Sequence, residues 1–379
     1  MAEIIFWLTL GIIFYTYFGY PLFILLLSLF VNHEIKKGEM EPNVTVLITA
    51  YNEEKNIVAK LENTLSLDYP KEKLEIIVAS DASEDRTDQI VREFSTRGVI
   101  LHRVEGRVGK TETQNQTVKR AKGDIVIFSD ATTKYKKDAI RKIIRNYNDP
   151  SIGAVSGRYE YVNPTGAPVG LGSILFWKYE NSVKSRQTRI ETVTGCCGCI
   201  YSVRKSLYEP LPREIISDLV EPLKILEKGY RIAFEPEAIA YEETTETSEE
   251  EFGMRVRVIS RGMSGLWYMR KLFNPFQYGF VTFQLFSHKV LRWMIPFMLP
   301  FLLISNLFLV GYPFYALTFV AQVLFYIGAM GGYLLDKMGK KVKLLALPLY
   351  YCIVNAASVA AFFRTVFGKK AIVWETVRK

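Results

Sequence analysis

The stretch VTVLITAYNE, residues 44–53, decides the fold of this 379-residue chain. Its first part, Val44–Ala50, is an apolar run of strand length, and the polar Tyr51-Asn52-Glu53 follows it directly. Helical periodicity then extends over residues 52–65. A strand without polar alternation is typical of a sheet that is buried on both faces, as parallel sheets are. The stretch therefore predicts the first strand and helix of an α/β domain.

The alternation of strand and helix continues to about residue 130. Apolar runs predict three more strands, and the segments between them predict helices. These are strands over 74–80, 98–104 and 124–128, a helix that ends at Arg92 and a helix over 111–121. Repeated strand–helix units imply a parallel sheet with helices on both faces.

Polar residues follow three of the predicted strands at the point where each strand ends. They are Tyr51-Asn52-Glu53, Asp81-Ala82-Ser83 and Asp130-Ala131-Thr132. Because ligands of such sheets bind at the carboxyl ends of the strands, we expect the functional site there. The first strand is not followed by G-x-G-x-x-G, and the chain has no G-x-x-x-x-G-K-[ST]. These absences argue against a dinucleotide-dependent oxidoreductase and a P-loop protein.

Four apolar segments lie outside this domain. The chain is 49% hydrophobic and 23% charged, with a mean hydropathy of +0.09. The apolar surplus is concentrated in residues 4–31, 293–311, 313–335 and 344–363, whereas 38–288 has the composition of a soluble protein. Segments of this length are candidates to cross a bilayer. The pattern excludes a wholly soluble enzyme, a disordered chain and a pure transporter.

Basic residues beside the apolar segments predict the direction in which these segments cross the membrane. Lys36 and Lys37 follow the first segment, Glu3 precedes it, and the basic loop 336–343 follows the third segment. Since cytoplasmic flanks are the ones enriched in Lys and Arg, we expect the soluble domain and this loop in the cytoplasm. The protein is then integral to the cell (inner) membrane.

The last apolar segment, 344–363, has two interpretations. Strict alternation would place the basic tail outside, which the positive-inside rule opposes. Pro348 and Asn355 interrupt the segment, so we expect it to be re-entrant or interfacial rather than a regular span. A fourth full span remains the alternative.

Charge and cysteine content argue against nucleic-acid binding and against a zinc site. The net charge is +9, but much of the excess flanks the apolar segments, so no nucleic-acid partner is expected. Cys196, Cys197 and Cys199 cluster without a Cys-x-x-Cys pair, which argues against a zinc site. Crowded cysteines of this kind suit a reducing cytoplasm.

The polar residues at the strand ends favour binding of a nucleoside diphosphate. Acidic groups there would repel phosphate unless a cation bridges them, so Asp130 is a candidate ligand of Mg²⁺ or Mn²⁺. Lys110 follows a turn at 107–109 and can meet diphosphate charge, while Tyr51 offers a ring or a hydroxyl to a base. Asp81 is equally well explained as a helix N-cap.

The motifs together resemble the family 2 glycosyltransferases, specifically the membrane-embedded ones related to cellulose, chitin and hyaluronan synthases. Residues 44–53 resemble the first strand and its uridine-contacting turn, which implies donor contacts from Ala50, Tyr51 and Glu53. Residues 81–87 resemble the second nucleotide-binding turn, with Asp81 as a contact and Ala82 where Gly is common.

Arg107-Val108-Gly109-Lys110, followed by Asn115, resembles the R-x-G-K-x-x-x-x-N segment. The likeness covers roughly residues 40–265. It implies a glycosyltransferase A-type α/β domain that binds a nucleotide-sugar, has a mostly parallel sheet and is flanked by transmembrane helices.

Two motifs depart from the family pattern. Asp130-Ala131-Thr132 stands where Asp-x-Asp is usual, so Asp130 carries over as the metal ligand and Thr132 only weakly. Residues 195–199, GCCGC, resemble the acceptor-site segment Phe-Phe-Cys-Gly-Ser, and Cys197 and Gly198 match it. A tight strand of small residues explains this second segment equally well.

The resemblance also implies a catalytic pair. Ser217-Asp218 resembles the end of the Thr-Glu-Asp segment, and Asp218 lies eleven residues before Gly229, the family's spacing for the catalytic base. An N-cap is the alternative for Asp218. Arg257 lies in the region that resembles Gln-x-x-Arg-Trp and would hold the departing diphosphate. The Gln and the Trp are absent, which puts processive synthesis in doubt.

The resemblance thus implies an inverting, metal-dependent hexosyltransferase that moves a sugar from a nucleotide-sugar, taken as a UDP-sugar, to a glycan or lipid-linked acceptor among membrane lipids. A processive polysaccharide synthase and a non-catalytic nucleotide-sugar sensor are the alternatives. The expected parts are a transmembrane helix at 1–36, a cytoplasmic domain at 37–270, an interfacial connection at 271–292, transmembrane segments at 293–365 and a basic tail at 366–379.

Overall fold

The computed structural model describes residues 1–368. Over that range it has one eight-stranded sheet in the order β3-β2-β1-β4-β7-β6-β8-β5. The strands are β1 (Val44–Ala50), β2 (Leu74–Ser80), β3 (Val99–Arg103), β4 (Ile125–Asp130), β5 (Lys134–Tyr135), β6 (Ile152–Val162), β7 (Ile200–Arg204) and β8 (Arg231–Glu243). β1 pairs in parallel with β2 and β4, β2 with β3, and β6 with β8, whereas β7 runs antiparallel to its neighbours β4 and β6. The prediction of an α/β domain with a mostly parallel sheet is confirmed.

The predicted strands agree with the observed ones to within two residues. The first predicted helix is different, because α3 (Ile57–Leu65) begins five residues later than 52–65 implied. The backbone N–H groups of residues 52–54 donate to side chains of residues 83–87. These residues therefore link two strand-end turns and do not start a helix.

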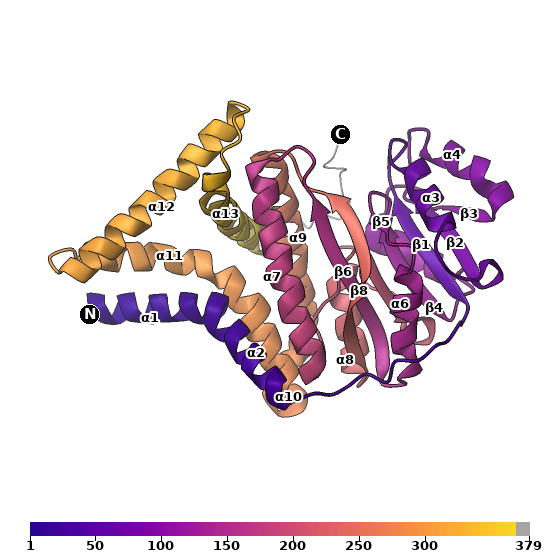
Figure 1. Ribbon diagram of the computed structural model, residues 1–379, viewed down its shortest axis with the longest axis horizontal. Coiled ribbons are helices and arrows are strands. Elements are labelled where there is room, and N and C mark those ends of the chain that lie inside the picture. Colours follow the sequence, from indigo (N-terminus) through magenta and orange to yellow (C-terminus); the bar gives the residue numbers. More distant parts are fainter. Residues whose placement is uncertain (369–379) are drawn as a thin grey trace.

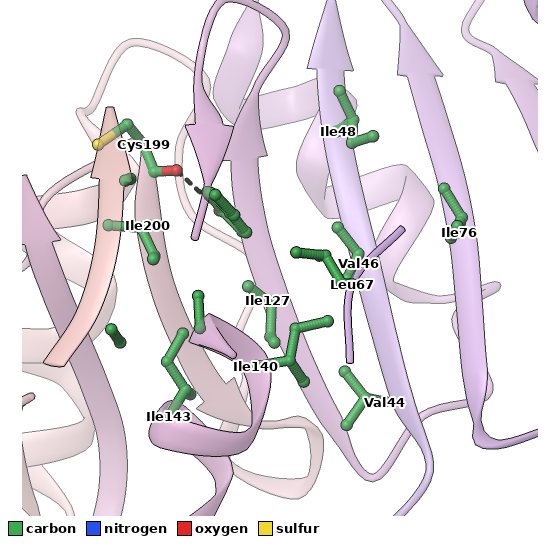
Figure 2. Close-up of a cluster of buried hydrophobic side chains, with 14 of the residues drawn as sticks. Val44, Val46, Ile48, Leu67, Ile76, Ile127, Ile140, Ile143, Cys199 and Ile200 are labelled. Carbon is green, nitrogen blue, oxygen red and sulfur yellow. Dashed lines mark hydrogen bonds between the residues drawn. The ribbon is translucent and has the colours of Figure 1, made fainter. Parts of the chain in front are cut away.

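The core lies on both faces of the sheet. Val46 of β1, Ile127 of β4 and Ile140 of α6 (Ala139–Ile144) are each 0% exposed and meet on one face (Figure 2). Burying such a side chain contributes about 1.5–3 kcal/mol to folding. The helices α4 (Thr87–Glu93) and α5 (Lys110–Val118) complete the connections between the parallel strands.

Two long helices separate the sheet from the apolar helices (Figure 1). They are α7 (Pro168–Ile190), which packs on β6, and α9 (Ser248–Tyr268). α9 starts with a capping box, in which Thr247 Oγ1 accepts from the Glu250 backbone N–H at 3.2 Å. The shorter α8 (Ser217–Glu227) packs against α9. Both α7 and α9 contact the last apolar helix.

Within residues 1–368, four helical stretches are long and apolar enough to cross a membrane: Ala2–Phe30, Pro275–Leu307, Pro313–Lys337 and Lys343–Phe367. The first contains α1 (Ala2–Phe14) and α2 (Tyr20–Phe30), and the second contains α10 (Pro275–Leu285) and α11 (Leu291–Leu307). The third is α12 and the fourth contains α13 (Ala346–Phe367). Much of the expected interfacial connection at 271–292 is helical, with a kink at Gly279, after which the helix continues into α11.

The prediction that Pro348 and Asn355 interrupt the last segment is wrong. Pro348 lies in the first turn of α13, where a backbone N–H has no partner within the helix in any case. Asn355 is buried, and its Nδ2 donates to the Tyr351 carbonyl at 2.8 Å, so it fits inside an unbroken helix. The basic tail from residue 369 lies outside the described residues, and the side of the membrane on which it lies stays a prediction.

Candidate active site

The turns after β1 and β2 are bonded to each other. The Glu53 N–H donates to Thr87 Oγ1 at 2.8 Å, and Asn52 Oδ1 accepts from the Glu84 N–H at 2.8 Å. Ala82 has φ = +56°, a conformation that costs a side-chain-bearing residue about 1–2 kcal/mol. This explains in physical terms why glycine suits the position. The strained turn is held in place by its bonds to the first turn.

Asp81 supports a neighbouring loop. Its carboxylate is fully buried and accepts from the backbone N–H groups of Val108 and Gly109 and from Thr113 Oγ1. Gly109 has φ = +93°, which lets the turn bring two N–H groups onto one carboxylate. Since α4 begins only at Thr87, Asp81 is not a helix N-cap. Its direct contact with a nucleotide stays a prediction.

Tyr51 is also engaged by this loop. The guanidinium of Arg107 lies 3.4 Å from the centre of the Tyr51 ring, and Tyr51 is 8% exposed. A cation this close to the ring face forms a cation–π contact. The ring is thus held against the loop that leads into Lys110, at the edge of the predicted donor site.

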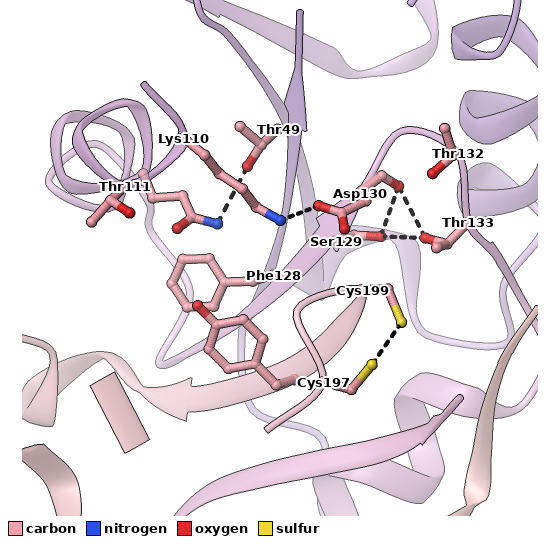
Figure 3. Close-up of polar contacts among 12 residues, drawn as sticks. Thr49, Lys110, Thr111, Phe128, Ser129, Asp130, Thr132, Thr133, Cys197 and Cys199 are labelled. Atoms are coloured by element: carbon pink, nitrogen blue, oxygen red, sulfur yellow. Dashed lines mark hydrogen bonds and ion pairs between the residues drawn. The ribbon is translucent and has the colours of Figure 1, made fainter. Parts of the chain in front are cut away.

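Lys110 and Asp130 form an ion pair at the carboxyl edge of the sheet (Figure 3). Burial lowers the pKa of Lys110, but the carboxylates of Asp130 and Asp218 more than offset this and raise it above its ordinary value. The ammonium therefore stays charged. This arrangement brings together the predicted diphosphate contact, the predicted metal ligand and the predicted base.

Lys60 supports the turn that carries Asp130, and the sequence analysis did not identify it. It is 1% exposed, and its Nζ donates to the Thr133 carbonyl at 2.9 Å and lies 4.0 Å from the centre of the Tyr135 ring. Burial lowers its pKa to about 7, against the opposing effect of Asp130. Nothing but a stretch of helical periodicity marks Lys60 in the sequence.

A second carboxylate, also missed, reaches the metal-motif turn from β8. Thr132 Oγ1 donates to Glu242 Oε1 at 2.6 Å, and the Tyr159 hydroxyl donates to Glu242 Oε2. Thr132 occupies the position where the family's second acid is usual. Strand pairing between β5 and β8 brings Glu242 to it, across 110 residues of sequence.

Asp218 lies against the small-residue segment 195–199. The Cys196 N–H donates to the Asp218 carbonyl at 2.9 Å. A Cβ placed on Gly198 would lie 2.7 Å from Asp218 Oδ2, so glycine is the residue that leaves room for the carboxylate. Cys197 and Cys199 are buried free thiols whose sulfur atoms are 3.2 Å apart. The segment is therefore packed directly around the predicted base.

The helix-cap explanation of Asp218 does not hold. Ile216 is the N-cap of α8, and Asp218 is the second helical residue. Burial raises the pKa of Asp218, opposed by Lys110. A raised pKa makes a carboxylate a better proton acceptor. Glu221, the nearest acid along the helix, is 1% exposed and accepts from the Tyr201 hydroxyl at 3.0 Å.

Two arginines of α9 face the same site. Arg257 lines the cavity described below, and so does Arg261, one helical turn on. Arg261 Nη2 donates to the Ile215 carbonyl at 2.7 Å and to Thr111 Oγ1 at 3.1 Å. Burial lowers the pKa of Arg261 to about 10, so it remains charged at neutral pH. It ties α9 to the starts of α5 and α8.

One cavity of about 1240 Å³ joins most of these residues. Among the predicted site residues, those that line it are Glu53, Lys110, Asp130, Cys197, Gly198, Asp218 and Arg257. Ala50, Tyr51 and Asp81 are not among the lining residues and support it from behind. Of the residues that the sequence analysis missed, Glu242 and Arg261 also line it.

Aromatic side chains form one wall of the cavity. Trp177 of α7 packs edge-on against Tyr159, with ring centres 4.7 Å apart, and Tyr161 lies 4.5 Å from Tyr159. The Trp177 indole N–H is buried without a hydrogen-bond partner among residues 1–368. An aromatic face with an unused donor suits a sugar ring. The α9 segment lacks the family's Trp, and these rings come from β6 and α7.

The cavity continues between the apolar helices. Its lining includes residues of all four candidate spans: Phe6, Leu10, Ile13, Tyr17, Leu299, Leu302, Asn306, Thr318, Ala321, Phe325, Leu347, Val354 and Ser358. A single hollow therefore reaches from the strand ends of the sheet to the apolar helices. We refer to this second part as the apolar limb.

The donor set fits a divalent cation only in part. In the described part of the chain, no three His, Cys, Asp or Glu side chains cluster closely enough to hold a metal ion. Asp130 and Glu242 offer two carboxylates that line the cavity, and hard cations prefer oxygen ligands of this kind. Phosphate oxygens and water would have to provide the rest.

Comparisons with known proteins agree with this geometry. The model of the family described as Glycosyl transferase family 2 matches residues 45–211. The chain is 29% identical over 274 residues to the Probable glycosyltransferase YdaM of Bacillus subtilis (strain 168), covering 66% of this chain and 64% of that protein. It is 30% identical over 231 residues to the Poly-beta-1,6-N-acetyl-D-glucosamine synthase of Staphylococcus aureus (strain COL), covering 59% and 55%. The chain thus spans less than two thirds of the length of these relatives.

A solved structure shares the fold. The mannosyltransferase PcManGT from Pyrobaculum calidifontis, in complex with GDP-Man and Mn²⁺, superposes with a TM-score of 0.74 at 19% identity, over 97% of this chain and 100% of that one. The family match ends at Leu211, so the roles of Asp218 and Arg257 stay predictions. Residues 45–211 are therefore similar to glycosyl transferase family 2, and the described chain shares the fold of PcManGT.

Proposed function

We propose that this protein transfers a sugar, with inversion at the anomeric carbon, from a nucleotide-sugar of the UDP-sugar class to a lipid-linked acceptor. One observation carries the proposal. The cavity that holds the predicted donor and base residues continues into a limb lined by four apolar helices. A wholly soluble acceptor would not need this limb.

Asp218 is the proposed base. It takes the proton of the acceptor hydroxyl while that oxygen attacks the anomeric carbon and the bond to the nucleoside diphosphate breaks on the opposite face. Its raised pKa and the space left by Gly198 support this role. Cys197 and Gly198 would lie beside the acceptor sugar.

Lys110 and Arg257 are the proposed contacts of the leaving diphosphate. Lys110 is a charged, half-buried ammonium, and Arg257 lines the cavity from α9 with a planar guanidinium. The base end of the nucleotide would lie near Ala50, Tyr51 and Glu53. Asp81 would act there by holding the loop that carries Lys110.

Asp130, with Glu242 beside it, would hold Mg²⁺ or Mn²⁺. The metal, when bound, would add positive charge against the diphosphate leaving group. The bond between Lys110 and Asp130 would have to open to admit it, so the ammonium would then be free to meet phosphate oxygens.

We also propose that this protein is integral to the inner membrane and that its catalytic domain lies in the cytoplasm. The basic flanks of the apolar segments support this orientation. A cytoplasmic site would face the pool of nucleotide-sugars.

A processive polysaccharide synthase is the second candidate, because several relatives are named as poly-β-1,6-N-acetyl-D-glucosamine synthases. Product length separates the two candidates. One sugar added to each acceptor supports single transfer, and a ladder of products supports processive synthesis.

The test uses the full chain in nanodiscs with Mn²⁺, a radiolabelled panel of UDP-sugars and GDP-mannose, and a membrane lipid extract. Label from one donor should enter the organic phase, and empty nanodiscs provide the background. Label that stays in the aqueous phase for every donor would contradict a lipid-linked acceptor. Nucleotide binding without transfer or hydrolysis would favour a sensor.

A further inference from the structure

Between the predicted catalytic residues and the apolar limb, the cavity is lined by a charged cluster on α7 and on the α10–α11 stretch. Its members are Glu180, Lys184, His288, Lys289 and Arg292, and all of them line the cavity. We refer to these five residues as the cationic cluster. The Glu180 carboxylate, 3% exposed, is its centre.

Glu180 holds three of the other members. Its Oε2 lies 3.0 Å from Arg292 Nη1 and 3.2 Å from His288 Nε2, and its Oε1 lies 3.9 Å from Lys289 Nζ. One carboxylate thus faces the basic side chains of both Arg292 and Lys289 before Lys184 is counted. The cluster carries more positive than negative charge.

Lys184 is the member without an anionic partner. It is 4% exposed, and within residues 1–368 no carboxylate oxygen lies within ion-pair distance of its Nζ, which instead lies 5.5 Å from the centre of the Trp177 ring. A buried, unpaired ammonium is costly unless an anion compensates it. Lys184 lowers the pKa of Asp218, so it also lies within electrostatic range of the predicted base.

The position of the cluster defines the anion. Lys110, Arg257 and Arg261 line the part of the cavity that is proposed for the donor diphosphate. The cluster lies on α7 and on the α10–α11 stretch, and that stretch is itself one of the four that line the apolar limb. An anion bound there has the catalytic residues on one side and an apolar channel on the other.

We propose that the cationic cluster binds the phosphate of a lipid phosphate whose chain occupies the apolar limb. The lipid-linked acceptor would then be an anionic lipid with a phosphate close to the sugar or hydroxyl that reacts. This inference rests on the proposed function and specifies its acceptor. Charge complementarity and the continuity of the cavity support it.

The experiment measures binding to the full chain in nanodiscs made of zwitterionic lipid. Three probes separate the contribution of the phosphate from that of the lipid chain: farnesyl phosphate, farnesol and inorganic phosphate. Farnesyl phosphate should bind at least about tenfold more tightly than either of the others, since a charge-assisted contact and apolar burial each contribute. Equal affinity for farnesyl phosphate and farnesol would overturn the phosphate site. Equal affinity for farnesyl phosphate and inorganic phosphate would overturn the binding of a lipid chain in the apolar limb.

Two variants of α7 test the assignment to Lys184. Lys184→Met should weaken farnesyl phosphate binding by about tenfold or more and leave farnesol and UDP–Mn²⁺ binding unchanged. Lys178→Met is the matched control, because Lys178 is on the same helix, is exposed and does not line the cavity. If Lys184→Met does not fold, Lys289→Met provides the same comparison.

The outcomes separate this inference from the proposed function. An equal loss of UDP–Mn²⁺ binding in Lys184→Met would assign the lysine to the donor site and overturn the inference. Farnesyl phosphate binding that is unchanged in both lysine variants would overturn it too. In either case, label transfer to a neutral lipid would still support the proposed glycosyl transfer.

Discussion

Gly198→Ala should displace the predicted base without touching the donor site. The new Cβ would lie 2.7 Å from Asp218 Oδ2 and 3.2 Å from Asp218 Cγ, whereas ordinary contact begins at 3.4 Å. The carboxylate must therefore move by about 0.7 Å. A misplacement of about 1 Å can cost roughly 10²-fold in rate, so we expect turnover to fall by about 10- to 100-fold.

The assay compares turnover, UDP–Mn²⁺ affinity and thermal unfolding on one preparation. Affinity should stay within about twofold, because Lys110 and Asp130 are not displaced. Gly253→Ala is the control, since a Cβ there meets nothing within 4 Å on an exposed face of α9. Turnover of Gly198→Ala equal to that of the control would refute the contact between Gly198 and the base.

Three further predictions concern the metal, the fold and the topology. Asp130→Ala should abolish Mn²⁺-dependent UDP binding in calorimetry, and Thr132→Ala should weaken it less. Unchanged UDP binding by Asp130→Ala would refute its assignment as a metal ligand. Ala82→Gly should raise stability by about 0.5–1 kcal/mol, because glycine relieves the strain of φ = +56° at some entropic cost, and a lower unfolding temperature would contradict this. Reporter fusions at Glu41 and Gly339 should both be cytoplasmic, and opposite behaviour would refute the proposed topology.

The local sequence pattern was sufficient to predict the strands in the parallel half of the sheet. Val44–Ala50 and Leu74–Ser80 are recognisable because buried parallel strands are apolar on both faces. The strand-end rule then gathered Glu53, Asp81 and Asp130 at one edge. These residues follow strands of the repeated strand–helix units, so their order in the sequence is enough to place them at the same edge of the sheet.

The rest of the site depends on contacts between distant segments. Glu242 reaches Thr132 only because β8 pairs with β5, and nothing in its own sequence neighbourhood marks it. Trp177 faces the cavity because of the rotation of α7, which the mixed apolar and basic pattern of residues 174–189 does not specify. Asp81 was assigned to the nucleotide, and its buried contacts with the 108–109 backbone are visible only in three dimensions.

The central claim is that Asp218 deprotonates the acceptor in a glycosyl transfer. Its most direct test is Asp218→Asn, with turnover and donor affinity measured on the same preparation across pH. The amide is nearly isosteric, so UDP–Mn²⁺ affinity should be kept. Turnover should fall by about 10²–10⁴-fold, and the wild-type rate should rise with pH through a midpoint above the ordinary pKa of an aspartate, because burial raises the pKa of Asp218. Near-normal turnover of Asp218→Asn would contradict the account.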